Sequence, residues 1–516
     1  MPSSEQAVLR MVGISKKFPG VVANDGVDLE VRAGEVHALL GENGAGKTTL
    51  MSILCGLYHP DEGSIIWKGH PVRFASPRQA AAQGIGMVHQ DFKLIQRMTV
   101  AENVMLGQPS SRRALFDAPA AAAAVERVSA DFGLPIDPRT QVRQLSAGMQ
   151  QRVAILRVLS GRPDLVIFDE PTSVLTPQEA ESLFRMMRSL VQQGKSICFI
   201  THKLEEVMHI ATRVTVLRDG KVIDTSETRL TSPRELARRM VGREVLFTVT
   251  KEPSVPRDVT LEVQNLATAG APGQVALHDI SLQVRQGEIL GVAGISGNGQ
   301  NELAEAIAGL RPVLSGRITI DGRETAHSHP REIINMGVAY IPDKVRQNAV
   351  FMDLDLAHNA MAKSHRGAPL APFGVFRMRA IAAHVQRLLA AYQVRAPSQA
   401  TLARQLSGGN LQRLVLAREL SRAQHTPRLI IAANPTAGLD VGATEYVHTQ
   451  LLEQRDLGRA VLLISADLDE LLALSDRIAV LSAGHIVGTV PAGQVHLEDI
   501  GLMMGGTNAA GREPLS

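Results

Sequence analysis

The sequence is poor in aromatic residues and cysteines, and it carries almost no excess charge. Only 3% of its 516 residues are aromatic, so a platform for stacking bases or sugars is poorly supplied. The two cysteines, Cys55 and Cys198, lie in apolar stretches, which suggests neither a disulfide framework nor a zinc site. Lys and Arg number 54 and Asp and Glu number 51, and the net charge of +3 argues against a dedicated nucleic-acid-binding protein.

Long apolar runs are also missing. A membrane-spanning helix needs about 20 consecutive apolar residues, whereas the longest uncharged apolar stretches, such as Leu429–Ala433, have the length of a strand. Residues Met1–Arg10 lack the basic and apolar segments of a signal peptide. At roughly 100–200 residues per domain, the length corresponds to about three domains. We therefore expect a cytoplasmic protein of two or more domains.

The chain contains a long internal repeat. One glycine-rich loop begins at Gly41 and another begins 253 residues later, at Gly294. Two further pairs of motifs recur in the same order, at separations of 261 and 264 residues: Leu145–Met149 with Leu406–Asn410, and Asp169–Thr172 with Ala433–Thr436. A period of this length indicates duplicated domains rather than a solenoid of short repeats.

The repeat predicts two tandem domains of the α/β class. We place the first copy at residues 8–247 and the second at residues 258–505. The polar segment 248–257 contains two prolines and is expected to be a linker. Residues 506–516 are expected to be a disordered tail. The alanine-rich segment Ala118–Ala124 predicts a helix, to which we assign no chemistry.

The first glycine-rich loop has the form of a phosphate-binding loop. Val36–Leu40 is typical of a strand, Gly41–Thr48 fits the pattern G-x-x-x-x-G-K-[ST], and Thr49–Leu54 has helical spacing. Glycines let backbone N–H groups approach phosphate oxygens at the N-terminus of a helix. We expect Lys47 to contact the β- and γ-phosphates of ATP and Thr48 to bind Mg²⁺. The loop residues expected to contact ATP are Gly41, Asn43, Gly44, Gly46, Lys47, Thr48 and Thr49.

Two carboxylates follow a second apolar run. Leu165–Phe168 predicts a buried parallel strand, and Asp169 and Glu170 come directly after it. We expect Asp169 to hold Mg²⁺ through water and Glu170 to act as general base toward the attacking water. The alternative is a pair of acids that caps a turn. His202, after another apolar strand, fits a contact to the γ-phosphate, and Phe18 either stacks on adenine or belongs to the core.

The order of these motifs resembles that of the ABC ATPases. The stretch Leu145–Arg152 reads LSAGMQQR, and a signature at this place separates the family from other P-loop enzymes. Within the family, the chain is similar to the twin-cassette ATP-binding subunits of bacterial importers for simple sugars and nucleosides. The amino-acid sequence of Val174–Glu179 is closer to that of the nucleoside importers in this group. The stretches that carry the similarity are Gly84–Gln90, Thr99–Val104, Glu170–Glu179 and Gly337–Pro342.

The resemblance implies an architecture, cofactors and partners. Each cassette would have a RecA-like core, an antiparallel β subdomain and a helical subdomain. ATP and Mg²⁺ would be the cofactors, Gln90 a further catalytic residue and metal ligand, and ATP hydrolysis would drive solute import. Two membrane-spanning permease subunits and an extracytoplasmic solute-binding protein would complete the system. The chain would then lie peripherally at the cytoplasmic face of the bacterial inner membrane.

The second copy lacks the catalytic features of the first. Its loop has Gln300 at the lysine position and Asn301 at the position of the metal-binding hydroxyl. Ala433 and Asn434 stand where the carboxylates would be. Alanine cannot position a metal ion and an amide cannot take a proton from water. The remaining two positions hold Asp343, which corresponds to Gln90, and Ala466, which corresponds to His202.

The signature of the second copy, in contrast, keeps both of its glycines. ABC cassettes pair head to tail, so the resemblance implies that one phosphate loop faces the other signature, within the chain or between chains. The ATP site of the first copy would be completed by Ser407, Gly408, Gly409 and Asp440. The opposite site would lack its base and its metal ligands. The alternative is that the second copy serves only as a scaffold.

Two other functions are also compatible with parts of the sequence. A scaffold protein could sense ATP without hydrolysing it, and a soluble twin-cassette ATPase could act on ribosomes or DNA. The second class usually carries a long charged linker, zinc cysteines or a coiled coil, which this sequence does not have. An exporter would normally fuse a membrane span to the cassette. The choice between a sugar and a nucleoside rests on the resemblance alone, because specificity belongs to the other subunits.

Overall fold

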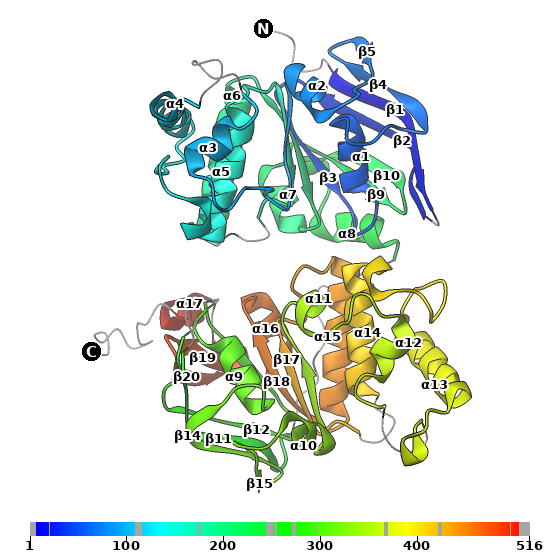
Figure 1. The fold of residues 1–516 in the computed structure, drawn as a ribbon, viewed down its shortest axis with the longest axis vertical. Helices are drawn as coiled ribbons and strands as arrows, with labels where there is room; N and C mark the ends of the chain where they lie inside the picture. Colours follow the sequence, from blue (N-terminus) through cyan, green and yellow to red (C-terminus); the bar gives the residue numbers. More distant parts are fainter. Residues whose placement is uncertain are drawn as a thin grey trace. The chain divides into compact units, whose positions relative to one another are not determined.

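The computed structural model describes residues 7–19, 21–108, 116–172, 175, 177–243, 251, 255–270, 275–295, 297–365, 370–421, 426–495 and 497–504. The chain forms two compact units. The first comprises Met1–Val245 with Asp440–Gly442, and the second comprises Leu246–Leu439 with Ala443–Ser516 (Figure 1). Each unit contains one six-stranded and one four-stranded sheet.

The six-stranded sheet of the first unit has the strand order β10-β9-β3-β8-β7-β6. All neighbouring pairs are parallel except β9 and β10 at one edge. Because β3, β7 and β8 are buried along their whole length, they are continuous apolar runs. The strands are β3 (Val36–Leu40), β6 (Ile85–Val88), β7 (Leu165–Asp169), β8 (Ser196–Thr201), β9 (Arg213–Arg218) and β10 (Lys221–Glu227).

The four-stranded sheet of the first unit is antiparallel, with the order β2-β1-β4-β5. Trp67 at the end of β4 is buried and donates its indole N–H to the carbonyl of Gln83, at 3.0 Å. The apolar faces of this sheet and of the parallel sheet pack into one core. The strands are β1 (Ala7–Phe18), β2 (Val21–Arg32), β4 (Glu62–Trp67) and β5 (His70–Val72).

Helices α3, α4 and α5 form a helical subdomain of the first unit (Figure 1). The buried side chain of Asn103 in α3 holds the preceding loop, because it accepts a hydrogen bond from the Ile95 N–H and donates to the Ile95 and Thr99 carbonyls. Asn359 makes equivalent bonds in the second unit. The helices of the first unit are α1 (Lys47–Leu54), α2 (Pro77–Ala82), α3 (Val100–Met105), α4 (Ala118–Asp131), α5 (Ala147–Leu159), α6 (Pro177–Gln192), α7 (Leu204–Ile210) and α8 (Pro233–Val241).

The second unit repeats this plan. Its six-stranded sheet, β16-β17-β18-β13-β19-β20, has the same connectivity, and its antiparallel sheet has the order β12-β11-β14-β15. The strands are β11 (Val259–Thr268), β12 (Ile280–Arg285), β13 (Ile289–Ala293), β14 (Val313–Ile320), β15 (Arg323–Glu324), β16 (Val338–Ile341), β17 (Leu429–Ala433), β18 (Ala460–Ser465), β19 (Arg477–Ser482) and β20 (His485–Pro491). The longer helices are α9 (Gln300–Ile307), α10 (Pro330–Asn335), α12 (Leu356–Met361), α13 (Met378–Ala391), α14 (Gly408–Leu420), α15 (Val441–Asp456), α16 (Leu468–Leu474) and α17 (Leu497–Met504), and α11 (Val345–Asn348) is a single turn.

The structure confirms the predicted α/β class and the tandem duplication. The strands predicted at Val36–Leu40 and Leu429–Ala433 are β3 and β17, and the alanine-rich segment lies in α4. The helix after the phosphate loop begins at Lys47, two residues before the predicted start, because the loop residues enter the helix directly after Gly46. The tail 506–516 and most of the linker 248–257 lie outside the described residues, so these boundaries stay predictions. Among the described helices, none is both long and apolar enough to cross a bilayer.

Candidate active site and its degenerate counterpart

The phosphate loop of the first unit connects β3 to α1 and requires glycine at two places. Gly46, directly before α1, has a φ of 99°, and a Cβ there would lie 2.1 Å from the carbonyl oxygen of Ala23. At Gly41 a Cβ would lie 2.3 Å from the carbonyl oxygen of Leu217. The loop can therefore approach β2 and β9 closely only without side chains at these positions.

Lys47, the first residue of α1, is buried at the centre of the loop. Its ammonium group donates to the carbonyl oxygens of Gly41 at 2.7 Å and Glu42 at 2.9 Å. Burial lowers the pKa of Lys47, whereas the nearby carboxylates of Glu170 and Asp169 act in the opposite direction. A buried cation held by neutral carbonyls next to two acids is suited to bind a further anion, such as a phosphate.

Asp169 ends β7 beside the N-terminus of α1. The Thr48 hydroxyl lies 3.2 Å from an Asp169 carboxylate oxygen. Burial, together with the negative charge of Glu170, raises the pKa of Asp169 to about 6. A hydroxyl and a carboxylate in contact are hard oxygen ligands, and they fit a Mg²⁺ ion that takes its other ligands from phosphate and water.

Glu170 follows with a φ of 46°, a left-handed backbone that is rare for a residue with a long side chain. One carboxylate oxygen accepts a hydrogen bond from the Gln90 amide at 3.0 Å, and the other lies 3.0 Å from Nδ1 of His202. Burial raises the pKa of Glu170, but the hydrogen bond and charge of His202 and the charge of Lys47 outweigh it, so the pKa lies below its usual value. The group is therefore an ionised, oriented carboxylate.

The structure thus brings together residues that are far apart in the sequence. Lys47 and Thr48 begin α1, and Asp169 and Glu170 lie at the end of β7. Gln90 and His202 reach Glu170 from the segments that follow β6 and β8. Phe18 is on β1, partly exposed, with its ring edge-on to Tyr58 at 5.4 Å.

Sequence reasoning missed one residue that supports this site. Glu206, in α7, accepts hydrogen bonds from the hydroxyls of Thr172 and Thr201, so it connects the turn after Glu170 to the end of β8. In the second unit Glu470 accepts from Thr436 at 2.8 Å. The sequence repeat could have indicated this residue. Glu206 and Glu470 are 264 residues apart, which is the separation of the repeated motif that begins at Asp169 and Ala433.

In the second unit the glycine-rich loop is closed by its own glutamine. The buried Gln300 side chain accepts a hydrogen bond from the Asn298 N–H at 3.1 Å and donates to the Ile295 carbonyl at 2.9 Å. Gln300 therefore satisfies loop groups that surround it without supplying a charge. Asn301, the next residue of α9, is exposed.

The end of strand β17 in the second unit also carries no charged residue. Ala433 ends β17, and Asn434 follows with a φ of 43°, close to that of Glu170. The side-chain oxygen Oδ1 of Asn434 accepts a hydrogen bond from the backbone N–H of Ala466 at 3.0 Å. Asp343, at the position of Gln90, bonds to the N–H of Lys344 at 2.8 Å. The described part of this unit keeps the backbone shape of the site and lacks its carboxylate pair.

The two signatures begin helices in the same way. Ser146 caps α5 by accepting the Met149 N–H at 3.3 Å, and Ser407 caps α14 by accepting the Asn410 N–H at 3.4 Å. Gly408 and Gly409 form the first turn of α14. Asp440 directly precedes α15 and groups with the first unit. Thr176, its counterpart in the first copy, lies outside the described residues.

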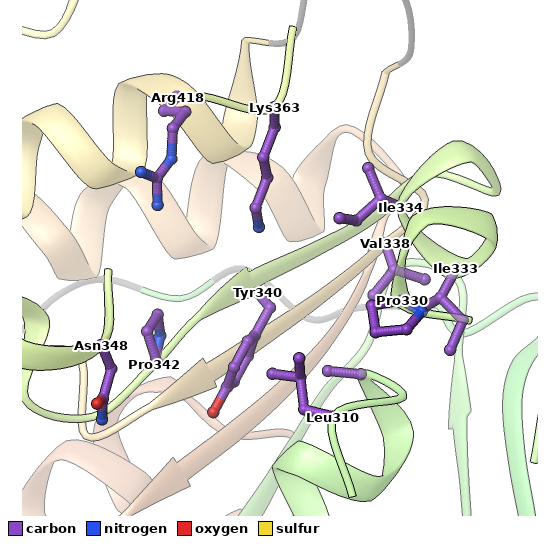
Figure 2. A pocket seen from close by; sticks show the side chains of 11 residues that line it. Leu310, Pro330, Ile333, Ile334, Val338, Tyr340, Pro342, Asn348, Lys363 and Arg418 are labelled. Atoms are coloured by element: carbon purple, nitrogen blue, oxygen red, sulfur yellow. The ribbon is translucent and has the colours of Figure 1, made fainter. Parts of the chain in front are cut away.

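A hollow in the second unit lies beside β16, close to Asp343. Figure 2 shows Lys363 and Arg418 extending from the helical subdomain toward Tyr340, with Leu310 on the opposite side. Both cations pair with the fully buried Glu419, Lys363 at 2.8 Å and Arg418 at 3.0 Å. The hollow therefore has apolar walls and a fixed, charged rim.

The ABC transporter family model matches two segments of the chain, residues 24–173 and 277–437. The chain therefore belongs to the ABC transporter family, and it is an ATPase built of two tandem cassettes, which are the two copies described above.

Individual relatives match over almost the whole length. The chain is 45% identical to the guanosine import ATP-binding protein NupO of Bacillus subtilis, over 97% of this chain and 98% of that protein. It is also 45% identical to the glucose import ATP-binding protein TsgD13 of Haloferax volcanii, over 98% and 96% respectively. Among solved structures, the archaeal ribosome recycling factor aABCE1, in complex with the ribosomal stalk protein aP1, gives a TM-score of 0.63 at 19% identity over 96% of this chain and 93% of that chain. This last likeness shows the fold alone.

Replacing Gly46 by Ala is expected to abolish ATP binding, because the added Cβ would meet the Ala23 carbonyl at 2.1 Å and displace the loop. The matched control is Gly69→Ala, in the β4–β5 turn. Gly69 also has a positive φ, 82°, but a Cβ there would meet nothing within 4 Å. Titration with a fluorescent ATP analogue measures the effect. Equal affinities of the two variants would show that the close approach does not shape the site.

Proposed function

We propose that the chain is the ATP-hydrolysing subunit of a bacterial ABC importer for a nucleoside, with a simple sugar as the alternative solute. The observation that carries the proposal is the 45% identity to a guanosine import ATP-binding protein over 97% of this chain. The equal identity to a glucose import protein keeps the sugar as the alternative. The import path would be formed by two permease subunits at the inner membrane, supplied by an extracytoplasmic solute-binding protein.

Each residue of the first site would have a defined role. Lys47 and the loop glycines would bind the phosphates of ATP, and Thr48, Asp169 and Gln90 would hold Mg²⁺. When bound, Mg²⁺ neutralises charge on the phosphates of ATP. Glu170 orients the attacking water and accepts its proton. His202, directly after β8, lies 3.0 Å from the Glu170 carboxylate and would orient it, and it would also contact the γ-phosphate.

The signature of the second cassette would complete this site when the cassettes pair head to tail. Ser407 and the backbone N–H groups of Gly408 and Gly409 lie at the N-terminus of α14, which favours a negative charge. Asp440 would close the site on the other side of the nucleotide. The second site, with Gln300 and Asn434, would not hydrolyse ATP.

The hollow of Figure 2 is suited to receive a permease helix. It combines an apolar floor, which a helix can cover, with the cationic Lys363 and Arg418. It lies at the end of β16 next to Asp343, so a movement of the nucleotide-site loops would reach it directly. In the first cassette, Gln90 stands at the corresponding point.

A soluble ATPase acting on ribosomes is less well supported. The structural likeness to a ribosome recycling factor is at 19% identity, whereas import ATP-binding proteins match at 45% over nearly the full chain. A pull-down that recovers ribosomes and no polytopic protein would favour this second function.

The composite site can be tested by a matched pair of serine variants. Ser407→Ala and Ser146→Ala each remove the same helix cap, which costs about 1 kcal/mol of stability in either case. We expect Ser407→Ala to lower the steady-state ATPase rate by about tenfold or more, because it also removes a donor to the γ-phosphate. Ser146→Ala should leave the rate within about twofold. Equal losses in the two variants would contradict head-to-tail pairing.

The import function can be tested in cells that lack the chain. Deletion is expected to abolish high-affinity uptake of a radiolabelled nucleoside, with glucose and ribose uptake unchanged. The wild-type chain should restore uptake and the Glu170→Gln variant should not. Loss of sugar uptake alone would show that the transported solute is a sugar and not a nucleoside. Unchanged uptake of all these solutes would contradict the import function.

A further inference from the structure

One region of the second cassette has a composition unlike the rest of the chain. Residues 356–418, which include α12, α13 and α14 up to Arg418, contain no Asp or Glu, and Glu419 of α14 follows directly. The same residues contain nine cationic side chains, whereas the whole chain has 54 Lys and Arg against 51 Asp and Glu. The nine are Lys363, Arg366, Arg377, Arg379, Arg387, Arg395, Arg404, Arg413 and Arg418. In the corresponding segment of the first cassette, 100–157, five acids offset most of the charge of seven arginines.

Some of these cations have structural partners and others do not. Lys363 and Arg418 pair with Glu419, and Arg404 pairs with Asp353 from outside the segment. Arg377, Arg379 and Arg387 are exposed, and none of them forms an ion pair with any residue that the structure describes. These three guanidinium groups are therefore free to bind an external anion.

An apolar loop stands next to the unpaired arginines. In residues 372–379, which we call the Phe373 loop, the side chains of Phe373, Val375, Phe376 and Met378 are exposed to solvent. Phe373 is 103% exposed, and its φ of 56° is unfavourable for an aromatic residue. The whole chain has only 12 phenylalanines, so two in one exposed loop are unusual. Contiguous exposed apolar groups of this kind mark interaction sites.

A hollow lies at the base of the Phe373 loop. It is lined by Leu370 before the loop and by one face of α13, with Ala380, Ala383 and Ala390 as small apolar residues. His384 and Arg387 lie at the same face. Within the second unit, α13 is the outermost helix on the side away from β11 and β14 (Figure 1). Cations, exposed aromatic rings and an apolar recess thus occur together at one end of the helical subdomain.

We propose that the Phe373 loop and α13 bind an anionic phospholipid surface. Phe373 and Phe376 would enter the interface between headgroups and acyl chains, which aromatic rings favour. Arg377, Arg379 and Arg387 would pair with lipid phosphates. Single-stranded nucleic acid is the other anionic partner, but Val375 and Met378 offer no flat face to a base, whereas both suit a lipid interface. This binding is separate from the import function and does not depend on the solute.

The test is flotation of the purified full-length chain with vesicles. The wild-type chain is expected to float with phosphatidylcholine vesicles that contain phosphatidylglycerol and to stay unbound with phosphatidylcholine alone. Arg377→Gln with Arg379→Gln should weaken binding by about fivefold for each arginine. Phe373→Ser with Phe376→Ser should weaken it by about tenfold or more. Since none of these residues is in the ATP site, the ATPase rate of each variant should stay unchanged and confirms folding.

Two controls make the result specific. Leu314→Ser with Leu457→Ser removes two equally exposed apolar residues of the same unit and should leave binding intact. Arg377→Lys with Arg379→Lys keeps the positive charge and should retain most of the vesicle binding. Equal flotation of all variants, or none for the wild type, would overturn the proposal. Tight binding of single-stranded RNA that the same arginine and phenylalanine variants abolish, without vesicle binding, would also overturn it in favour of a nucleic-acid site.

Discussion

The buried ammonium group of Lys47 is the interaction on which the first cassette's site depends. It lies between two loop carbonyls and near Asp169 and Glu170, so its charge is balanced inside the protein. A buried charge without partners would cost several kcal/mol. In the second cassette the neutral Gln300 replaces the cation, and the two acids are replaced by Ala433 and Asn434. These replacements belong together, because loss of the cation alone would leave the buried carboxylates without a counter-charge, and loss of the carboxylates alone would leave the buried cation without one.

The parallel sheet brings these charged groups together with further side chains. Strands β3, β6, β7 and β8 end at one edge, and side chains separated by more than 100 residues meet there. Gln90 and His202 both contact Glu170, so the carboxylate is held from two sides. The two cassettes differ in two regions. One is this strand edge, which in the second cassette lacks the lysine and the carboxylate pair, and the other is the helical subdomain, where residues 356–418 contain no Asp or Glu and include the Phe373 loop.

The sequence predicts those parts of the structure that local pattern determines. Apolar runs locate β3, β7 and β17, and the loop pattern locates Gly46 and Lys47. The pattern does not reveal that Gln300 closes its own loop, because that depends on the backbone positions of Asn298 and Ile295. It also does not reveal the left-handed backbone of Glu170. Glu206 was missed because its contacts, to Thr172 and Thr201, require the strand ends to be placed first, although the 264-residue spacing of Glu206 and Glu470 was available.

The central claim is that one chain turns over ATP at a single site, in the first cassette. Steady-state ATPase assays of Glu170→Gln and Asn434→Ala, with ATP affinity measured in parallel, test it most directly. We expect Glu170→Gln to bind ATP normally and to lose about a hundredfold or more of its turnover, and Asn434→Ala to stay within about threefold of the wild-type rate. Near wild-type turnover in Glu170→Gln, or a comparable loss in Asn434→Ala, would contradict the claim.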